Sequence, residues 1–93
     1  MRKIIILFFI TSTTAIAQPN GKLLASQCFQ CHGPNGRSVG EIDSLAGESA
    51  AEIYDELVEF KFEPKNDIMN LQARIYTDAE MRAIANYIGT LPK

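Results

Sequence analysis

The stretch Cys28-Phe29-Gln30-Cys31-His32 contains both cysteines and the single histidine of the 93-residue chain. Two thiols three residues apart, followed at once by an imidazole, form the Cys-x-x-Cys-His pattern to which a c-type haem is attached. At the end of a helix, each thiol can form a thioether with one of the two vinyl groups on the haem edge. His32 then supplies the proximal ligand to the iron. The stretch predicts one covalently bound haem c, attached through Cys28 and Cys31.

Three other interpretations of these residues are weaker. A disulfide between Cys28 and Cys31 would close a loop too short to remove much chain entropy. A thioredoxin-like redox pair needs a βαβ framework, and the sequence shows no strand pattern. A structural zinc ion needs four ligands, and no Cys or His lies outside this stretch. We therefore favour haem attachment.

Residues 1–17 show the three-part pattern of a secretory signal peptide. Two basic residues precede the unbroken apolar run Ile4–Ile10, and Ala15-Ile16-Ala17 supplies the small residues that signal peptidase requires. We expect cleavage after Ala17, which leaves residues 18–93 as one exported domain. The apolar run is too short to span the ~30 Å hydrocarbon core of a bilayer, so we expect no stable membrane insertion. Because c-type haem is attached outside the cytoplasm, the periplasm is the expected location.

Charge and size narrow the possible partners further. The chain has 11 acidic and 9 basic residues without a basic stripe, so we expect no nucleic-acid partner. A domain this small commonly needs a disulfide, a metal or a cofactor to complete its core, and the predicted haem would meet that need. Four acidic residues share one predicted helix, which we interpret as a solvated surface: Glu52, Asp55, Glu56 and Glu59.

The second axial ligand of the iron decides the redox behaviour. No second histidine exists, so a methionine thioether is the expected ligand, and Met/His ligation raises the reduction potential. Met81 belongs to a helical stripe of apolar positions and is expected in the core. Met69 follows a segment without helical periodicity, so we predict a loop that brings its thioether to the second haem face. The alternative is that Met69 only packs against the haem and the sixth coordination site is open.

Helical signals account for the rest of the sequence, and the predicted fold class is all-α. Asn20 can cap a first helix that ends in the haem motif. A second helix runs from Ser49 to about Phe60, and a third begins at Thr77 and continues to about Thr90. Both begin with a Ser/Thr-x-x-Glu capping box.

Together these features resemble the class I cytochromes c. The shared order is an N-terminal helix ending in Cys-x-x-Cys-His-Gly, a Leu-Ala-Gly loop, a middle helix, a Met-bearing loop and a C-terminal helix with an aromatic residue. The resemblance implies a small all-α fold, in which three main helices wrap around one covalently attached haem. By position it implies the following roles: thioether attachment at Cys28 and Cys31, axial ligation by His32 and Met69, and a close crossing of the terminal helices at Gly21 and Tyr87.

Part of the sequence is similar to one branch of that class, the cytochrome subunit of flavocytochrome c sulfide dehydrogenase. Ile68-Met69, Tyr76-Thr77-Asp78 and Ala83-Ile84-Ala85-Asn86-Tyr87 follow the spacing of that family. The resemblance implies a flavoprotein partner that contains FAD, oxidises sulfide and donates electrons to this haem, with another cytochrome or an oxidase as acceptor. The chain would then be the haem subunit of an enzyme and contain no catalytic residues. Two departures from the family pattern are Asn70-Leu71-Gln72 after the methionine and Asp43 in place of a loop proline.

Two alternatives to this function stay open at the level of sequence. A free diffusible periplasmic shuttle would carry single electrons between respiratory or photosynthetic complexes. Such a shuttle should present a small apolar patch rimmed by charge, whereas a stable subunit should expose a larger apolar surface at the haem edge. A haem-based sensor would require an open sixth coordination site.

Overall fold

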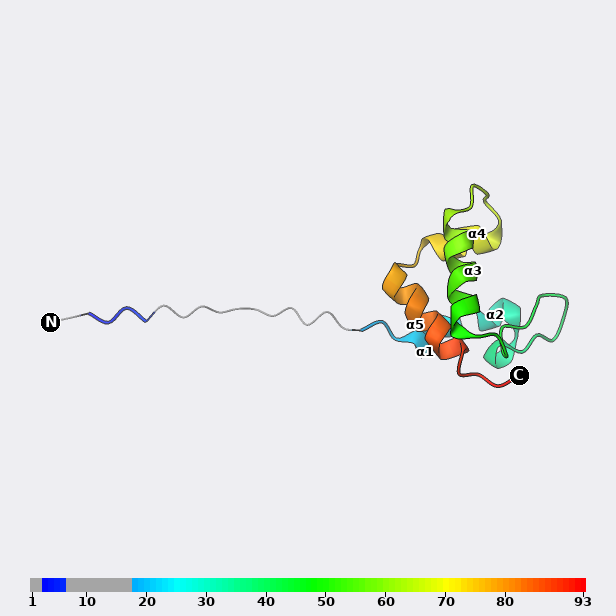
Figure 1. The fold of residues 1–93 in the computed structure, drawn as a ribbon, viewed down its shortest axis with the longest axis horizontal. Helices are drawn as coiled ribbons and strands as arrows, with labels where there is room; N and C mark the ends of the chain where they lie inside the picture. Colours follow the sequence, from blue (N-terminus) through cyan, green and yellow to red (C-terminus); the bar gives the residue numbers. More distant parts are fainter. Residues whose placement is uncertain (1–2, 7–17) are drawn as a thin grey trace.

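The computed structural model describes residues 3–6 and 18–93 (Figure 1). The cleavage site predicted after Ala17, and most of the predicted signal peptide, lie outside the described residues. All regular structure in the described residues is helical, which confirms the predicted all-α class. The elements are α1 (Gly21–Ser26), α2 (Phe29–His32), the 3-10 turn η1 (Pro34–Gly36), α3 (Ala50–Phe62), α4 (Ile68–Arg74) and α5 (Asp78–Ile88). None of these helices has the length and apolar character needed to cross a bilayer.

Helices α1 and α5 cross in close contact, as the resemblance implied for Gly21 and Tyr87. A Cβ atom on Gly21 would lie 2.2 Å from the carbonyl oxygen of Ala83 and 3.4 Å from the Cβ of Tyr87. The first of these distances is too short for any side chain, so the backbones can approach only because residue 21 is glycine. The side chain of Asn20 caps α1 by accepting a hydrogen bond from the Leu23 N–H at 3.1 Å, as predicted.

Replacing Gly21 by alanine is expected to lower the free energy of unfolding by about 1–3 kcal/mol, the usual cost of overpacking a close contact. The clash is with the backbone of α5, which cannot move as a side chain would. Chemical denaturation of the haem-loaded protein would measure the loss. Gly40→Ala is the matched control, because nothing lies within 4 Å of a Cβ atom built there. Equal stability of the two variants would show that the α1–α5 crossing tolerates a methyl group.

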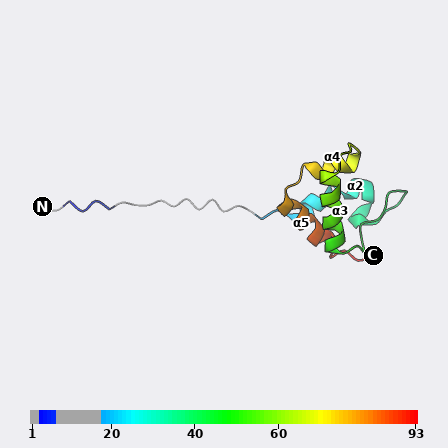
Figure 2. The same ribbon diagram turned by 45° about the horizontal axis from the view of Figure 1, so that its top comes forward.

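Helix α3 lies between α5 and α2 in both views, with α4 across one of its ends (Figures 1 and 2). The Ser49 hydroxyl caps it by accepting a hydrogen bond from the Glu52 N–H at 3.1 Å. Among the described residues, the Glu52 side chain makes no return bond, so only half of the predicted capping box forms. Ile53 and Leu57 are buried, and the helix continues to Phe62, slightly beyond the expected end.

The acidic face of α3 makes stability depend on pH through Glu56. Partial burial, a hydrogen bond with Glu48 and the nearby negative charges raise the pKa of Glu56 from 4.5 to about 7. Because the folded protein then binds this proton more tightly than the unfolded chain, the unfolding free energy should fall as pH rises from about 4.5 to 7.

Glu56→Gln removes this ionisation and should therefore be more stable than the native protein at pH 8, with no advantage at pH 4.5. The Glu56 carboxyl is only partly desolvated and the residue as a whole is exposed, so screening by solvent keeps the difference below about 1 kcal/mol. Urea denaturation of both proteins across this pH range measures the difference, which should shrink at ~1 M salt because the Debye length is then about 3 Å. A constant difference at all pH values would contradict the raised pKa.

The prediction that Met69 lies in a loop is wrong, because this residue lies in helix α4. The side chain of Asn70 accepts a hydrogen bond from the N–H of the N-cap residue Asp67 at 3.1 Å, and Asn70 and Ala73 are buried. A helix of 7 residues spans only two turns, so it shows almost no repeating apolar pattern in the sequence. Its stability comes from the contacts that it makes with α3.

The core confirms the interpretation of Met81. This side chain is only 2% exposed and packs with apolar residues of α3 and α5. Helix α5 begins with the predicted capping box, in which the Thr77 hydroxyl accepts from the Glu80 N–H at 3.1 Å and the Glu80 carboxylate from the Thr77 N–H at 2.9 Å. The cluster of buried apolar residues comprises Ala25, Ile53, Leu57, Ala73, Tyr76, Met81, Ile84, Ala85 and Ile88.

Candidate cofactor site

The two cysteines and the histidine lie on a single helical turn. Cys28 is the N-cap of α2, and its carbonyl oxygen accepts hydrogen bonds from the N–H groups of Cys31 at 3.3 Å and His32 at 2.9 Å. Both thiols are free, Cys31 exposed and Cys28 half-buried. Burial raises the pKa of the Cys28 thiol above its usual value. The turn therefore presents two thiols and one imidazole from neighbouring positions.

The imidazole of His32 is oriented by a backbone carbonyl. Its Nδ1 lies 2.7 Å from the carbonyl oxygen of Asp43. Because a carbonyl oxygen only accepts hydrogen bonds, Nδ1 carries the proton of the neutral imidazole, and Nε2 then has a free lone pair for a metal. A hydrogen bond of this kind fixes the ring and makes the coordinating nitrogen more basic. The sequence analysis missed this role of Asp43 because a backbone acceptor has no side-chain signature.

The chain turns sharply at Gly33, directly after His32. Gly33 has a φ of 92° and is buried, and a Cβ atom there would lie 1.8 Å from the Arg37 carbonyl oxygen. Only glycine fits this conformation and this close approach. Within the loop, the Ser38 N–H donates to the Ser44 hydroxyl at 2.8 Å.

A chain of three side chains links Gln27, the residue before Cys28, to helix α4, which carries Met69. The hydroxyl of Tyr76 donates to Oε1 of Gln27 at 2.9 Å, and Nε2 of Gln72 donates to the Tyr76 hydroxyl at 2.7 Å. Tyr76 is only 3% exposed, and burial raises the pKa of its phenol. Gln27 directly precedes Cys28, and Gln72 and Tyr76 follow Met69 in the sequence. The bond between Tyr76 and Gln27 spans 49 positions, and the sequence analysis did not predict it.

Met69 is half-buried and packs against the hydrophobic core. The described chain also leaves large apolar side chains exposed on the two segments next to the predicted ligands. They are Val39 and Ile42 in the loop after His32, and Ile68, Leu71 and Ile75 in and just after α4. Exposed apolar side chains on segments beside a binding site mark surface that a cofactor or a partner protein covers.

The donor set fits a haem better than a bare metal ion. In the described residues, no group of three or more His, Cys, Asp or Glu side chains could hold a metal ion. The free thiols of Cys28 and Cys31 lie beside the imidazole of His32 and suit covalent attachment of a haem. The thioether of Met69 lies on a separate helix and suits Met/His ligation of its iron. The residues present therefore fit a covalently bound haem.

The helical fold and this set of residues define a c-type cytochrome of class I. The chain belongs to the cytochrome c family, because residues 19–92 match the model of that family, described as cytochrome c. It is thus an electron-carrying protein of a family whose cofactor is covalently bound haem c.

Relatives with known names support the same class. The chain is 34% identical to the "Cytochrome subunit of sulfide dehydrogenase" of Chlorobaculum tepidum, over 84% of this chain and 72% of that protein. It is 35% identical to the "Cytochrome c-553" of Helicobacter pylori, over 98% of this chain and 99% of that protein. It is also 37% identical to the "Thiosulfate dehydrogenase electron acceptor" of Stutzerimonas stutzeri, over 70% of this chain but only 32% of that protein.

Proposed function

We propose that residues 18–93 form a cytochrome with a single haem that transfers one electron at a time. In this proposal Cys28 and Cys31 hold the haem through thioethers, and His32 and Met69 are the axial ligands of its iron. The observation that carries the proposal is the hydrogen bond from Nδ1 of His32 to a backbone carbonyl oxygen, which leaves Nε2 free to bind.

The bound haem would supply a one-electron iron couple, and the chain supplies the binding, orientation and environment. The Asp43 carbonyl keeps the imidazole of His32 in one tautomer and one orientation. As the second ligand of the iron, the Met69 thioether would raise the reduction potential and would close the iron to small molecules. The bonds among Gln27, Gln72 and Tyr76 tie the two ligand-bearing parts of the chain together.

We also propose that residues 1–17 are a signal peptide cleaved after Ala17 and that the domain works in the periplasm. The apolar run Ile4–Ile10 and the small residues at Ala15 and Ala17 support this. Mass spectrometry of the exported protein would test it, because cleavage at this position leaves Gln18 as the first residue.

For the partner, we propose a sulfide-oxidising flavoprotein that donates electrons to this haem. The similarity to a protein named as the cytochrome subunit of sulfide dehydrogenase supports this. So does an apolar surface: Ile68, Leu71 and Ile75 follow the i, i+3, i+7 spacing of one helix face and are 78%, 53% and 66% exposed. Apolar surfaces of this kind suit a stable subunit interface.

A free periplasmic shuttle is the second candidate. One observation favours it: the four acidic side chains of α3 are all exposed, as a surface for brief, salt-sensitive docking would be. They are Glu52, Asp55, Glu56 and Glu59. The similarity to a cytochrome c-553 over nearly the full length of both chains agrees with a small independent carrier.

Purification from the native periplasm, without steps that separate partners, would distinguish the two candidates. A low-spin c-type spectrum that co-elutes with flavin absorbance supports the dehydrogenase subunit. The same haem spectrum without flavin, in a fraction of the size of one small domain, supports the shuttle. A high-spin spectrum would contradict Met69 as a ligand and favour a sensor.

A further inference from the structure

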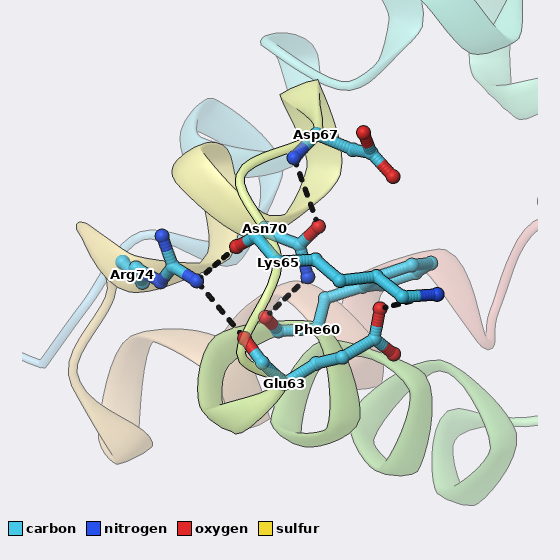
Figure 3. Close-up of polar contacts among 6 residues, drawn as sticks. All are labelled: Phe60, Glu63, Lys65, Asp67, Asn70 and Arg74. Carbon is cyan, nitrogen blue, oxygen red and sulfur yellow. Dashed lines mark hydrogen bonds and ion pairs between the residues drawn. The ribbon is translucent and has the colours of Figure 1, made fainter.

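The connection between α3 and α4 is held by one guanidinium group, that of Arg74. Its Nη2 donates to the carbonyl oxygen of Glu63 at 2.9 Å and to that of Lys65 (Figure 3). Its Nη1 donates to Oδ1 of Asn66 at 2.8 Å. Arg74 is the last residue of α4, so these bonds tie the end of that helix to the chain that leads into it. We call this set of bonds the Arg74 clamp.

A buried asparagine braces the same helix from inside. Asn70 is 1% exposed, and its Nδ2 donates to the Phe60 carbonyl oxygen of α3 at 2.9 Å. Its Oδ1 accepts from the Asp67 N–H at 3.1 Å, as Figure 3 shows. Asn70 therefore fixes the start of α4 to the last turn of α3, while the Arg74 clamp fixes its end. Met69 directly precedes Asn70 in this helix, whose other end carries the clamp.

A helix as short as α4 needs such anchors, because 7 residues are too few for an isolated helix to be stable in water. Any motion of α4 moves the Met69 side chain with it. A guanidinium presents its donors in a rigid plane, so it can hold several oxygens at fixed angles, and an ammonium group cannot do the same.

We propose that Arg74 is a positioning residue for Met69. The Arg74 clamp keeps the thioether at the iron and so holds off external ligands, an inference that rests on the proposed ligation by Met69. An external ligand can bind only in the fraction of molecules in which Met69 has moved away. Its apparent affinity therefore rises in proportion to that fraction. Without the clamp, the fraction of molecules in which Met69 has left the iron rises about tenfold, because charge-assisted hydrogen bonds that favour the closed state are lost.

The test is an imidazole titration of the ferric haem-loaded protein, followed by the weak far-red absorption band of the Met-to-iron bond. Arg74→Ala should bind imidazole about tenfold more tightly than the native protein. Arg74→Lys should remain close to Arg74→Ala, because one ammonium group cannot reach all three oxygens. The milder variant Asn66→Ala removes one acceptor from an exposed position, and its affinity should rise about threefold.

Arg82→Ala is the matched control. Arg82 is an exposed arginine of α5 that bonds Asp78 at 2.8 Å and lies 4.3 Å from the ring centre of Tyr54, without a contact to α4 among the described hydrogen bonds and ion pairs. Its removal should leave the imidazole affinity unchanged.

Four results would overturn the positioning role. Unchanged affinity in Asn66→Ala and Arg74→Ala would contradict it and leave Met69 ligation intact. An equal increase in Arg82→Ala would show a general loss of stability instead. If Arg74→Lys bound imidazole as weakly as the native protein, a positive charge at position 74 would be enough, and the geometry of the guanidinium would not matter. Absence of the far-red band in the native protein would remove both the ligation by Met69 and the positioning role.

Discussion

Replacing His32 by alanine is expected to abolish the low-spin spectrum and most of the yield of haem-loaded protein. His32 is the only histidine in the 93-residue sequence, so its loss leaves the iron without an imidazole ligand. Without a firmly held haem, this small domain also loses the group that completes its core. Optical spectra and the haem content of the purified protein would measure both effects, and we expect the yield to fall at least about tenfold.

Asp43→Ala provides the control for this prediction. The bond to Nδ1 of His32 comes from the backbone carbonyl of Asp43, which alanine retains. The spectrum and the haem content should therefore match those of the native protein. A loss as large as that in His32→Ala would show that the Asp43 carboxylate, and not the carbonyl oxygen, orients the ring.

Replacing Met69 by alanine is expected to remove the far-red band, convert the ferric iron to a high-spin form and lower the reduction potential. The thioether favours the ferrous state, and axial ligands set haem potentials over a range of roughly 0.8 V. We expect a fall on the order of 0.2 V, a substantial part of that range. Spectroelectrochemistry of the variant measures the potential, and carbon monoxide or imidazole should bind without competition.

Met81→Ala should show the opposite behaviour. Met81 is buried in the core, so truncation leaves a cavity and should lower the unfolding free energy by about 2–5 kcal/mol. The far-red band should remain and the potential should change little. If Met81→Ala lost the band and Met69→Ala kept it, the assignment of the distal ligand would be wrong.

Local signals in the sequence were enough to predict much of this protein. The caps at Asn20, Ser49 and Thr77 lie within three residues of the groups that they bind, and the structure shows each of them. The helical stripe of α5 predicted the burial of Met81, because one face of a helix repeats along the chain. The haem motif also needs only five consecutive residues, so it could be recognised without a fold.

Other features depend on pairs that are distant in the sequence, and only the folded chain reveals them. Helix α4 is too short to produce a periodic pattern, so Met69 was expected in a loop. The partner of His32 is a carbonyl oxygen 11 positions away, and a backbone atom is present whatever residue stands there.

The polar contacts around α4 depend on the fold in the same way. The bond from Tyr76 to Gln27 spans 49 positions, and the Arg74 clamp consists largely of backbone carbonyl oxygens. The chemistry of the site was therefore visible in residue types at short spacing. The orientation of its side chains was not, because tertiary packing decides which distant backbone groups meet them.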